Sequence, residues 1–310
     1  MAQVKTSSIS SKSFWPTDTV TNTERTVRGI GLGLSRRLAM STHTSLKRST
    51  FLSTCAVVAG ASLLVGGRAQ EISQVASSTN GKPSIVFCHG IWADGSCFSK
   101  VIEPLQAAGY ECISAQYPLN TTADDIAIVK KTLSRVSSPS ILVGHSYGGQ
   151  VITGAGTDDR VRGLVYICAL GPDEGETAQG QLGMFPTTPV FEHVEVADGR
   201  IWMKPAGIAD FCGDLPEAEQ KVVWATSYPP AADLFSAPMS TPAWKTKPSW
   251  YIVGKNDKAV PPDLERFVSK RMGAHTIELD SSHCAMLSQA QAVVDMIEKA
   301  ANAVLEKAAV

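Results

Sequence analysis

Short apolar runs alternate with helix-like segments from residue 82 onward, and this alternation constrains the fold more than any other feature of the sequence. Continuous apolar runs are typical of strands buried on both faces, as in parallel sheets that are covered by crossover helices. The expected strands span residues 84–88, 110–115, 140–143, 161–168, 247–254 and 275–279. The expected helices span residues 98–108, 121–136, 262–272 and 285–303. The pattern predicts an α/β fold with a mostly parallel central sheet and helices on both faces.

Residues 171–246 interrupt this alternation. The segment is rich in Gly, Pro and Ala, carries scattered aromatic residues, and is too long to be a loop without structure of its own. Because open α/β sheets bind ligands at the carboxyl ends of their strands, we expect this segment to form an inserted cap over those ends. The aromatic residues that we expect to line a substrate pocket there are Trp92, Phe185, Trp202 and Trp224.

Charge is divided unevenly along the 310 residues of the chain. Residues 1–69 carry nine Lys or Arg against two Asp or Glu, whereas residues 70–310 carry nineteen against twenty-seven. The larger part is therefore acidic, which argues against nucleic acid as a partner. The sequence leaves the oligomeric state open.

The basic amino-terminal part has the features of an export leader. Lys47 and Arg48 precede an apolar run at residues 51–65, and Gly67 and Ala69 form a small-x-small cleavage site. The apolar run is too short and too rich in small residues for a membrane span. We therefore expect a secreted or periplasmic protein that keeps no stable membrane span once the leader is removed.

These features predict a division of the chain into a leader and one folded domain. Residues 1–39 precede Met40 and are expected to be an upstream extension of the reading frame or disordered, with an amphipathic arm as the alternative. The other expected parts are a signal peptide at 40–69, a linker at 70–81 and the folded domain at 82–310.

The pentapeptide at residues 144–148, Gly-His-Ser-Tyr-Gly, lies between an expected strand and a helix-compatible stretch. A G-x-S-x-G sequence in this context is typical of a nucleophile elbow. This turn is so tight that the positions two residues before and after the serine have no room for a Cβ, so they are glycines. Such a turn exposes the Ser146 hydroxyl and directs the N–H of Tyr147 toward the reacting centre. Ser146 is therefore the candidate nucleophile.

A serine nucleophile needs a base, and histidine usually supplies it. His283 lies in the loop between the last expected strand and the last expected helix, where the fold can bring it to the elbow. The other histidines have less suitable positions in the leader, the first loop, the elbow itself, the cap and a strand: His43, His89, His145, His193 and His275. His283 is the candidate base.

The acid that orients the histidine should lie between the serine and the histidine in chain order. Asp257 follows the end of the strand expected at 247–254, at the correct end of the sheet. Asp263 and Glu265 fall on the next expected helix, and Asp280 is close to the histidine in the chain, so they remain alternatives. Asp257 is the preferred candidate.

Negative charge on a substrate oxygen requires donors that are fixed in advance. The fold supplies one N–H from the residue after the nucleophile, which is Tyr147. A second is expected from the loop after the first strand, at residues 89–95, where the N–H of Ile91 is the natural donor. Gly90 allows the chain to turn closely there.

The chain from about residue 82 resembles bacterial α/β-hydrolases of the EstC-like esterase type, which are related to plant methylesterases and hydroxynitrile lyases. The resemblance rests on Asp257, on His283 and on residues 89–96, 144–149, 171–176, 242–246 and 261–264. It implies the α/β-hydrolase fold, the three catalytic residues above, and neither a cofactor nor a metal.

Two positions depart from the lyases of this group. Cys284 follows the expected base where those lyases carry a lysine, and Ile91 stands where they carry a threonine. Both departures favour hydrolysis over cyanohydrin cleavage. The sequence therefore predicts a serine hydrolase that cleaves a small-molecule carboxylic ester through an acyl-enzyme. The alternatives are a cofactor-free lyase or oxygenase and a ligand-binding protein on the same fold.

The seven cysteines show no metal-binding spacing. Export would permit a disulfide, for which Cys97 and Cys212 are candidates without an assigned partner.

Overall fold

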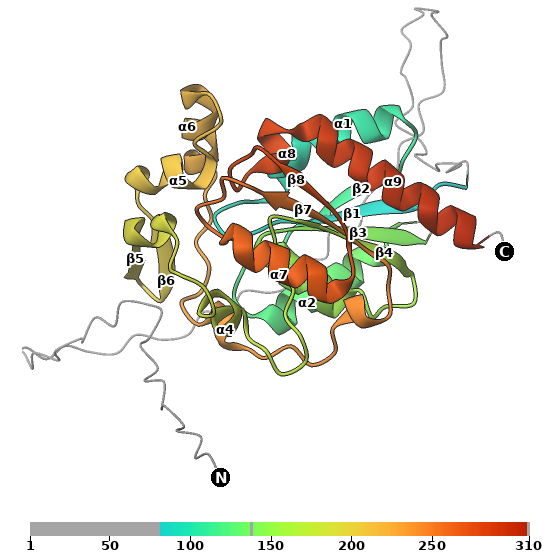
Figure 1. The fold of residues 1–310 in the computed structure, drawn as a ribbon, viewed down its shortest axis with the longest axis horizontal. Helices are drawn as coiled ribbons and strands as arrows, with labels where there is room; N and C mark the ends of the chain where they lie inside the picture. Colours follow the sequence, from blue (N-terminus) through green and yellow to red (C-terminus); the bar gives the residue numbers. More distant parts are fainter. Residues whose placement is uncertain (1–80, 137–138, 309–310) are drawn as a thin grey trace, which may run out of the picture. The chain divides into compact units, whose positions relative to one another are not determined.

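The computed structural model describes residues 81–136 and 139–308 (Figure 1). The leader predicted at residues 1–69 lies outside the described residues, as do residues 70–80 of the predicted linker. Export therefore stays a prediction.

Six strands form one sheet, and every strand in it runs parallel to its neighbours. In spatial order the strands are β2 (Cys112–Ala115), β1 (Ser84–Cys88), β3 (Ser140–His145), β4 (Val161–Ile167), β7 (Ser249–Gly254) and β8 (His275–Leu279). The inner strands β1, β3 and β7 are buried along their whole length, which explains their continuous apolar sequences. The predicted parallel α/β sheet is confirmed.

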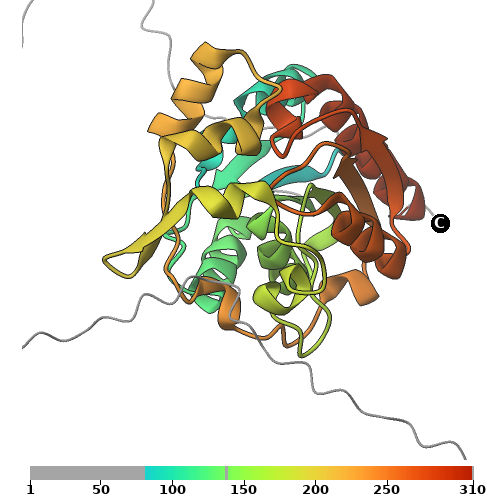
Figure 2. The ribbon, with the colours of Figure 1, turned by 60° about the vertical axis from the view of Figure 1, so that its left-hand side comes forward.

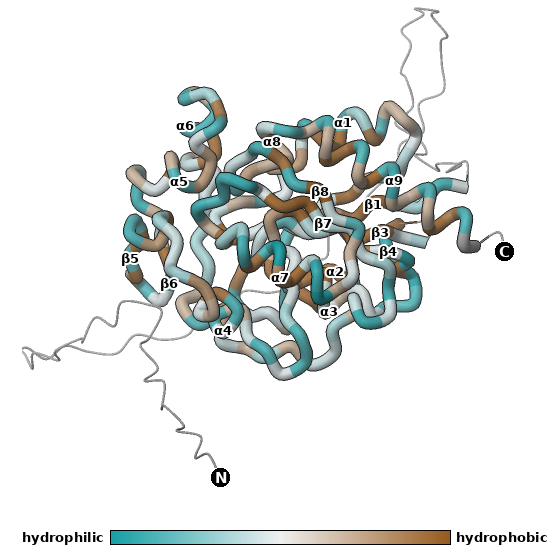
Figure 3. The backbone as a smooth tube through the Cα atoms, in the orientation of Figure 1, coloured by the Kyte–Doolittle hydropathy of each residue, from teal (hydrophilic) through white to brown (hydrophobic). Residues whose placement is uncertain are grey.

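Helices cover both faces of this sheet, as the alternation predicted (Figure 1). One face carries α1 (Ser99–Ala107), α8 (Ala285–Ser288) and α9 (Ala290–Ala308). The other face carries α2 (Thr122–Leu133), α3 (Tyr147–Ala155) and α7 (Pro262–Met272). Figure 3 shows hydrophobic residues concentrated on the central strands and polar residues on the outer turns of the helices. Within the described ranges, every helix is too short or too polar to cross a membrane.

Local sequence explains where several helices begin and end. Thr121 caps α2, since its side chain accepts a hydrogen bond from the Asp124 N–H at 3.1 Å. Helix α7 begins at a proline and ends before Gly273, whose φ of 63° favours glycine. The prediction of a single helix at residues 285–303 is wrong. The backbone of Gln289 leaves the helical region and separates α8 from α9.

Residues 171–246 form short elements of their own. They include α4 (Ala178–Leu182), an antiparallel hairpin of β5 (Val194–Ala197) and β6 (Arg200–Met203), α5 (Ile208–Cys212) and α6 (Glu217–Ala225). Figure 2 shows the hairpin and α6 at the periphery of the described domain. The segment is fixed to the loops of the sheet, since the indole of Trp92 donates to the Ile201 carbonyl at 2.9 Å and the Val190 N–H donates to the Lys258 carbonyl at 3.2 Å.

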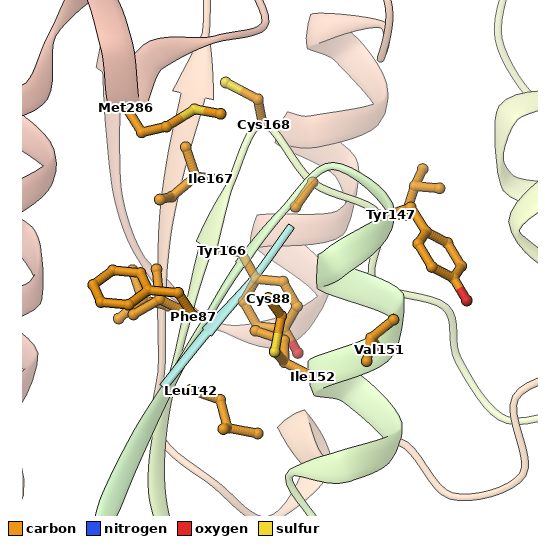
Figure 4. Close-up of a cluster of buried hydrophobic side chains, with 14 of the residues drawn as sticks. Phe87, Cys88, Leu142, Tyr147, Val151, Ile152, Tyr166, Ile167, Cys168 and Met286 are labelled. Carbon is orange, nitrogen blue, oxygen red and sulfur yellow. The ribbon is translucent and has the colours of Figure 1, made fainter. Parts of the chain in front are cut away.

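Helix α3 has two differently packed sides (Figure 4). Ile152 lies on the sheet side, with Cys88 and Tyr166, whereas Tyr147 points to the opposite side. There the Tyr147 hydroxyl donates a hydrogen bond to Asp125 of α2 at 2.8 Å. The Asp125 side chain is fully buried, and burial raises the pKa of its carboxyl group from 3.8 to about 6.

We predict that this aspartate makes the folded protein less stable as the pH rises. Its pKa is higher in the folded state, so the folded protein binds more protons between about pH 4 and pH 6 and loses stability through that range. The loss amounts to up to about 3 kcal/mol, which corresponds to the change in pKa. Asp125→Asn keeps an acceptor for Tyr147 and should abolish this loss in urea unfolding at about pH 4 and pH 7.

Asp124→Asn is the matched control, because the Asp124 side chain is exposed on the same turn of α2. Equal pH dependence of unfolding in the wild type and Asp125→Asn would contradict the prediction.

Candidate functional site

Ser146 occupies the turn between β3 and α3 with φ of 56° and ψ of −124°, a conformation that costs a non-glycine residue energy. The flanking glycines make this turn possible. A Cβ on Gly144 would lie 2.5 Å from the Gly148 carbonyl oxygen, and a Cβ on Gly148 would lie 2.1 Å from the Cys88 carbonyl oxygen. The geometry is that of the expected elbow.

Asp257 and His283 meet above this turn. The Asp257 Oδ1 atom accepts hydrogen bonds from the N–H groups of Ala259 at 2.6 Å and Val260 at 2.9 Å. Its Oδ2 atom lies 2.5 Å from His283 Nδ1, which therefore acts as the donor. Both side chains are buried, so this is a closely coupled pair in a water-poor environment.

The other ring nitrogen of His283, Nε2, is buried and has no hydrogen-bond partner among the described residues. Ser146 and His283 line the same small pocket. Since Nδ1 carries the proton in the neutral ring, Nε2 offers a lone pair to that pocket. The arrangement can accept a proton there.

His145, inside the elbow, supports the His283 loop instead of entering the pocket. Its Nε2–H group donates to the His283 carbonyl oxygen at 2.9 Å, and the two rings are 4.5 Å apart. Burial, and next the neighbouring His283 ring, lower the pKa of His145 well below its usual value, so the ring stays neutral. The elbow thus holds the histidine loop by its backbone.

The two residues whose N–H groups are expected to bind an oxyanion, Tyr147 and Ile91, both lie beside Ser146. Tyr147 is the first residue of α3, so no carbonyl within the helix can accept its N–H. Ile91 lines the Ser146 pocket, whereas the N–H of the next residue, Trp92, donates to the Tyr228 carbonyl. A Cβ on Gly90 would lie 2.7 Å from the Ser146 Cβ, so glycine lets the Ile91 loop approach the serine.

The pocket around Ser146 is small and apolar, with a volume of about 20 Å³. Its lining residues besides Ser146 and His283 are Ile91, Trp92, Leu170, Leu182, Phe191, Phe211, Phe235, Ala259 and Val260. Several of these come from residues 171–246, so the inserted segment supplies walls of the site.

Of the aromatic residues expected in the pocket, the structure places only Trp92 there among the residues described. Phe185 packs against Phe267 with ring centroids 6.2 Å apart, and Trp202 and Trp224 are 43% and 44% exposed. The positions of these three residues do not support their expected role. Trp202 is excluded because side chains alternate along β6 and its neighbours Ile201 and Met203 point inward.

Phe191, Phe211 and Phe235 line the pocket instead, and the sequence analysis did not select them. In residues 200–203, polar or outward-facing residues alternate with apolar inward-facing ones. This pattern could have shown from the sequence that Trp202 points away from the pocket. No comparable periodicity marks the three phenylalanines, since they lie in short, irregular elements.

The other carboxylates considered for the acid do not contact His283 by a hydrogen bond. Asp263 pairs with Arg266 at 2.9 Å and Asp280 pairs with Lys255 at 2.6 Å, with both carboxylates largely exposed. Glu265 is fully buried, and its Oε2 atom accepts a hydrogen bond from the Gly254 N–H at 2.9 Å. Asp257 is the carboxylate that contacts His283.

Cys168, Asp257 and Glu265 bring potential metal-ligating atoms within 4.8 Å of one another. Burial raises the pKa of the Cys168 thiol and of the Glu265 carboxyl group well above their usual values, which favours the protonated form of both groups. Metal ligands must be deprotonated, and Asp257 already accepts hydrogen bonds at both oxygens. The cluster is poorly suited to a metal ion.

The cysteines within the described residues are free thiols, including Cys97 and Cys212.

Comparison with known proteins places this geometry in context. Residues 85–296 match the model of the family described as "Alpha/beta hydrolase family". The alpha/beta hydrolase nvfD of Aspergillus novofumigatus (strain IBT 16806) is 29% identical over 252 residues, which are 73% of this chain and 99% of that protein. The carbendazim hydrolyzing esterase of Nocardioides sp. (strain SG-4G) is 27% identical over 113 residues, which are 32% of this chain and 47% of that protein.

Among solved structures, a pyrethroid hydrolase from Sphingobium faniae JZ-2 has the same fold. Its TM-score is 0.60 at 22% sequence identity, and the match covers 71% of this chain and 98% of that chain.

We predict that Gly148→Ala destabilises the protein by about 1–3 kcal/mol or more, because the new Cβ would meet a backbone carbonyl that cannot turn away. Urea unfolding measures the effect. Gly183→Ala is the control, since Gly183 has a helical φ of −68° and a Cβ there would lie 3.3 Å from its nearest neighbour. Equal stability of the two variants would contradict the prediction.

Proposed function

The chain belongs to the alpha/beta hydrolase family, and on this premise we propose that it is a serine esterase that cleaves a carboxylic ester through an acyl-enzyme intermediate. The observation that carries the proposal is the buried His283–Asp257 hydrogen bond of 2.5 Å, with the free Nε2 atom of His283 in the pocket of Ser146. The names of the relatives, an esterase and a pyrethroid hydrolase, support ester hydrolysis.

In the proposed reaction, the Ser146 hydroxyl attacks the ester carbonyl while His283 Nε2 takes the hydroxyl proton. Asp257 accepts the Nδ1–H bond throughout, which keeps the ring orientation and stabilises the imidazolium. The N–H groups of Ile91 and Tyr147 bind the oxyanion, and His283 then returns the proton to the leaving alcohol. Water, activated by the same histidine, releases the acid from Ser146.

We predict that Ser146→Ala lowers the kcat/KM for p-nitrophenyl acetate by at least about 10³-fold, because no other group in the pocket can form the acyl-enzyme. A fluorophosphonate probe should label the wild type and leave Ser146→Ala unlabelled. Ser134→Ala is the control, since the Ser134 hydroxyl caps α2 on the exposed surface.

Unchanged turnover in Ser146→Ala would overturn the proposal. A wild type that neither turns over esters nor reacts with the probe would favour the ligand-binding protein. A wild type that forms products other than an acid and an alcohol would favour the lyase or oxygenase.

A further inference from the structure

A second cavity, much larger than the Ser146 pocket, lies directly beside it. We call it the outer cavity; its volume is about 520 Å³, against about 20 Å³ for the Ser146 pocket. Trp92, Phe211, Val223, Cys284, Met286 and Leu287 form much of its apolar wall. The outer cavity is large enough for an aromatic or branched group, whereas the Ser146 pocket has room for about one water molecule.

Two rings separate these spaces. Trp92 and Phe211 line both, and their rings meet edge to face with centroids 5.9 Å apart. Trp92 is fixed, because its indole donates to the Ile201 carbonyl and its backbone N–H donates to the Tyr228 carbonyl. Phe211 has an apolar ring on α5, a helix of five residues. Rotation of Phe211 is therefore the simpler way to join the two spaces.

The position of His283 decides which half of an ester faces the outer cavity. The leaving alcohol takes its proton from His283 Nε2, so the alcohol oxygen must lie beside the imidazole. The ring centroids of Phe211 and His283 are 5.0 Å apart. Cys284, which follows His283 in the chain, lines the outer cavity. The outer cavity therefore adjoins, across the Phe211 ring, the position that the alcohol oxygen would occupy beside His283.

Three other walls of the Ser146 pocket, formed by Leu182, Phe235 and Val260, do not line the outer cavity. An acyl group on Ser146 has only this confined side available. Charge gives no preference for an anionic substrate, since Lys100 of the outer cavity is already paired with Glu219 at 2.6 Å, and the other charged lining residue is the carboxylate of Asp94, which accepts the Ser96 N–H.

We propose that the enzyme acts on esters of a small acid with a bulky, uncharged apolar or aromatic alcohol, and that the outer cavity holds the alcohol part. This inference rests on the proposed esterase function and deepens it.

The test uses ester pairs that have identical composition and opposite orientation. Benzyl acetate places the ring on the alcohol, and its isomer methyl phenylacetate places the ring on the acid, while both release alkyl alcohols. We expect the kcat/KM for benzyl acetate to be at least about tenfold higher, which corresponds to about 1.4 kcal/mol. Equal values, or a preference for methyl phenylacetate, would overturn the inference.

A cavity-filling variant tests the location. Val223→Phe should lower the ratio of the kcat/KM for naphthylmethyl acetate to the kcat/KM for methyl acetate by at least about tenfold, because the new ring fills space that only the bulky alcohol needs. Val196→Phe makes the same change on an exposed residue of β5, away from both cavities, and should alter neither. Loss of both activities in Val223→Phe, or no change in either, would contradict the assignment.

The two levels of the proposal fail differently. A wild type that is inert on every ester, methyl acetate included, would overturn the esterase function itself. Turnover of methyl acetate without a preference within the isomer pair would overturn only the role of the outer cavity.

A different observation carries a second inference, which concerns Glu265. This carboxyl group is fully buried on α7, and one of its oxygens lies within 4.8 Å of an Asp257 oxygen. Its Oε2 atom accepts the Gly254 N–H, no N–H or O–H group of the described residues donates to its buried Oε1 atom, and the Asp257 carboxylate lies within hydrogen-bonding reach of the Glu265 side chain. Two carboxyl groups therefore share one dry space.

In the described part of the chain, the one cation that acts on Glu265 is Arg266, and its effect on the Glu265 pKa is smaller than that of burial and of Asp257. The titratable groups that face Glu265 are Asp257, Cys168 and Tyr251, and the Arg266 guanidinium is engaged outside with Glu278 and Asp263. Asp257 accepts hydrogen bonds from N–H groups at both of its oxygens. Burial, and next the charge of Asp257, raise the pKa of Glu265 well above its usual value. The protonated form of Glu265, with an O–H to donate toward Asp257, is therefore favoured over a second buried carboxylate.

We infer that Glu265 is a positioning residue whose carboxylic acid O–H steadies Asp257 beneath His283, again on the premise of the esterase function. Glu265→Gln retains a neutral donor of similar shape and should keep the kcat within about threefold, with an unchanged pH profile of kcat/KM. Glu265→Leu removes the donor and should lower the kcat by about tenfold or more with little change in KM.

The low-field NMR signal of the His283 Nδ1 proton gives a readout that is independent of turnover. It should persist in Glu265→Gln and shift in Glu265→Leu. If Glu265 were ionised, Glu265→Gln would remove a charge beside Asp257 and move the acidic limb of the pH profile, which would overturn the inference. Equal kinetics of the two variants would do so as well.

Discussion

The close approach of backbone to backbone around Ser146 is the constraint on which the rest of the site depends. Gly144, Gly148 and the carbonyl of Cys88 lie so near one another that a single methyl group would collide with main-chain atoms. This contact fixes the start of α3 against the end of β1. The nucleophile, the N–H of Tyr147 and the Ile91 loop therefore share one rigid frame, since they lie on adjoining parts of these elements.

Burial then determines the electrostatics around that frame. The His283–Asp257 pair carries charge only where backbone N–H groups and the imidazole can stabilise it. Burial shifts the pKa values of the surrounding titratable groups toward their neutral forms. It lowers the pKa of His145 and raises the pKa values of Glu265 and Cys168. The Asp257 carboxylate would therefore be the main charge in an apolar shell, where it would stabilise the imidazolium of the proposed reaction.

Sequence reasoning succeeded where local chemistry or chain topology determines the structure. The alternation of strands and helices predicts the parallel sheet, and the glycines around Ser146 predict the tight turn, because both depend on near neighbours in the chain. The positions of Asp257 and His283 follow from strand order, since parallel strands present their following loops at one edge. These elements could be located without any coordinates.

The walls of the pocket could not be predicted in the same way. Phe191, Phe211 and Phe235 reach the site from short elements whose path is set by contacts between segments, whereas Trp202 has the right chemistry on the outward side of β6. Glu265 was visible as an acidic residue on a helix. Its contact with Asp257 depends on how α7 is rotated against the sheet, and the sequence pattern does not specify this rotation.

The hydrogen bond from the Trp92 indole to Ile201 couples the inserted segment to the loop that carries the Ile91 N–H. The two parts of the domain are therefore not independent modules in evolution or in engineering. A chimera that exchanged residues 171–246 with those of another family member would keep the Ile91 loop in register only if the new segment offered a carbonyl at the same place as Ile201. Diversification of the segment is thereby restricted at specific main-chain positions, among them the carbonyls of Ile201 and Tyr228 that hold Trp92.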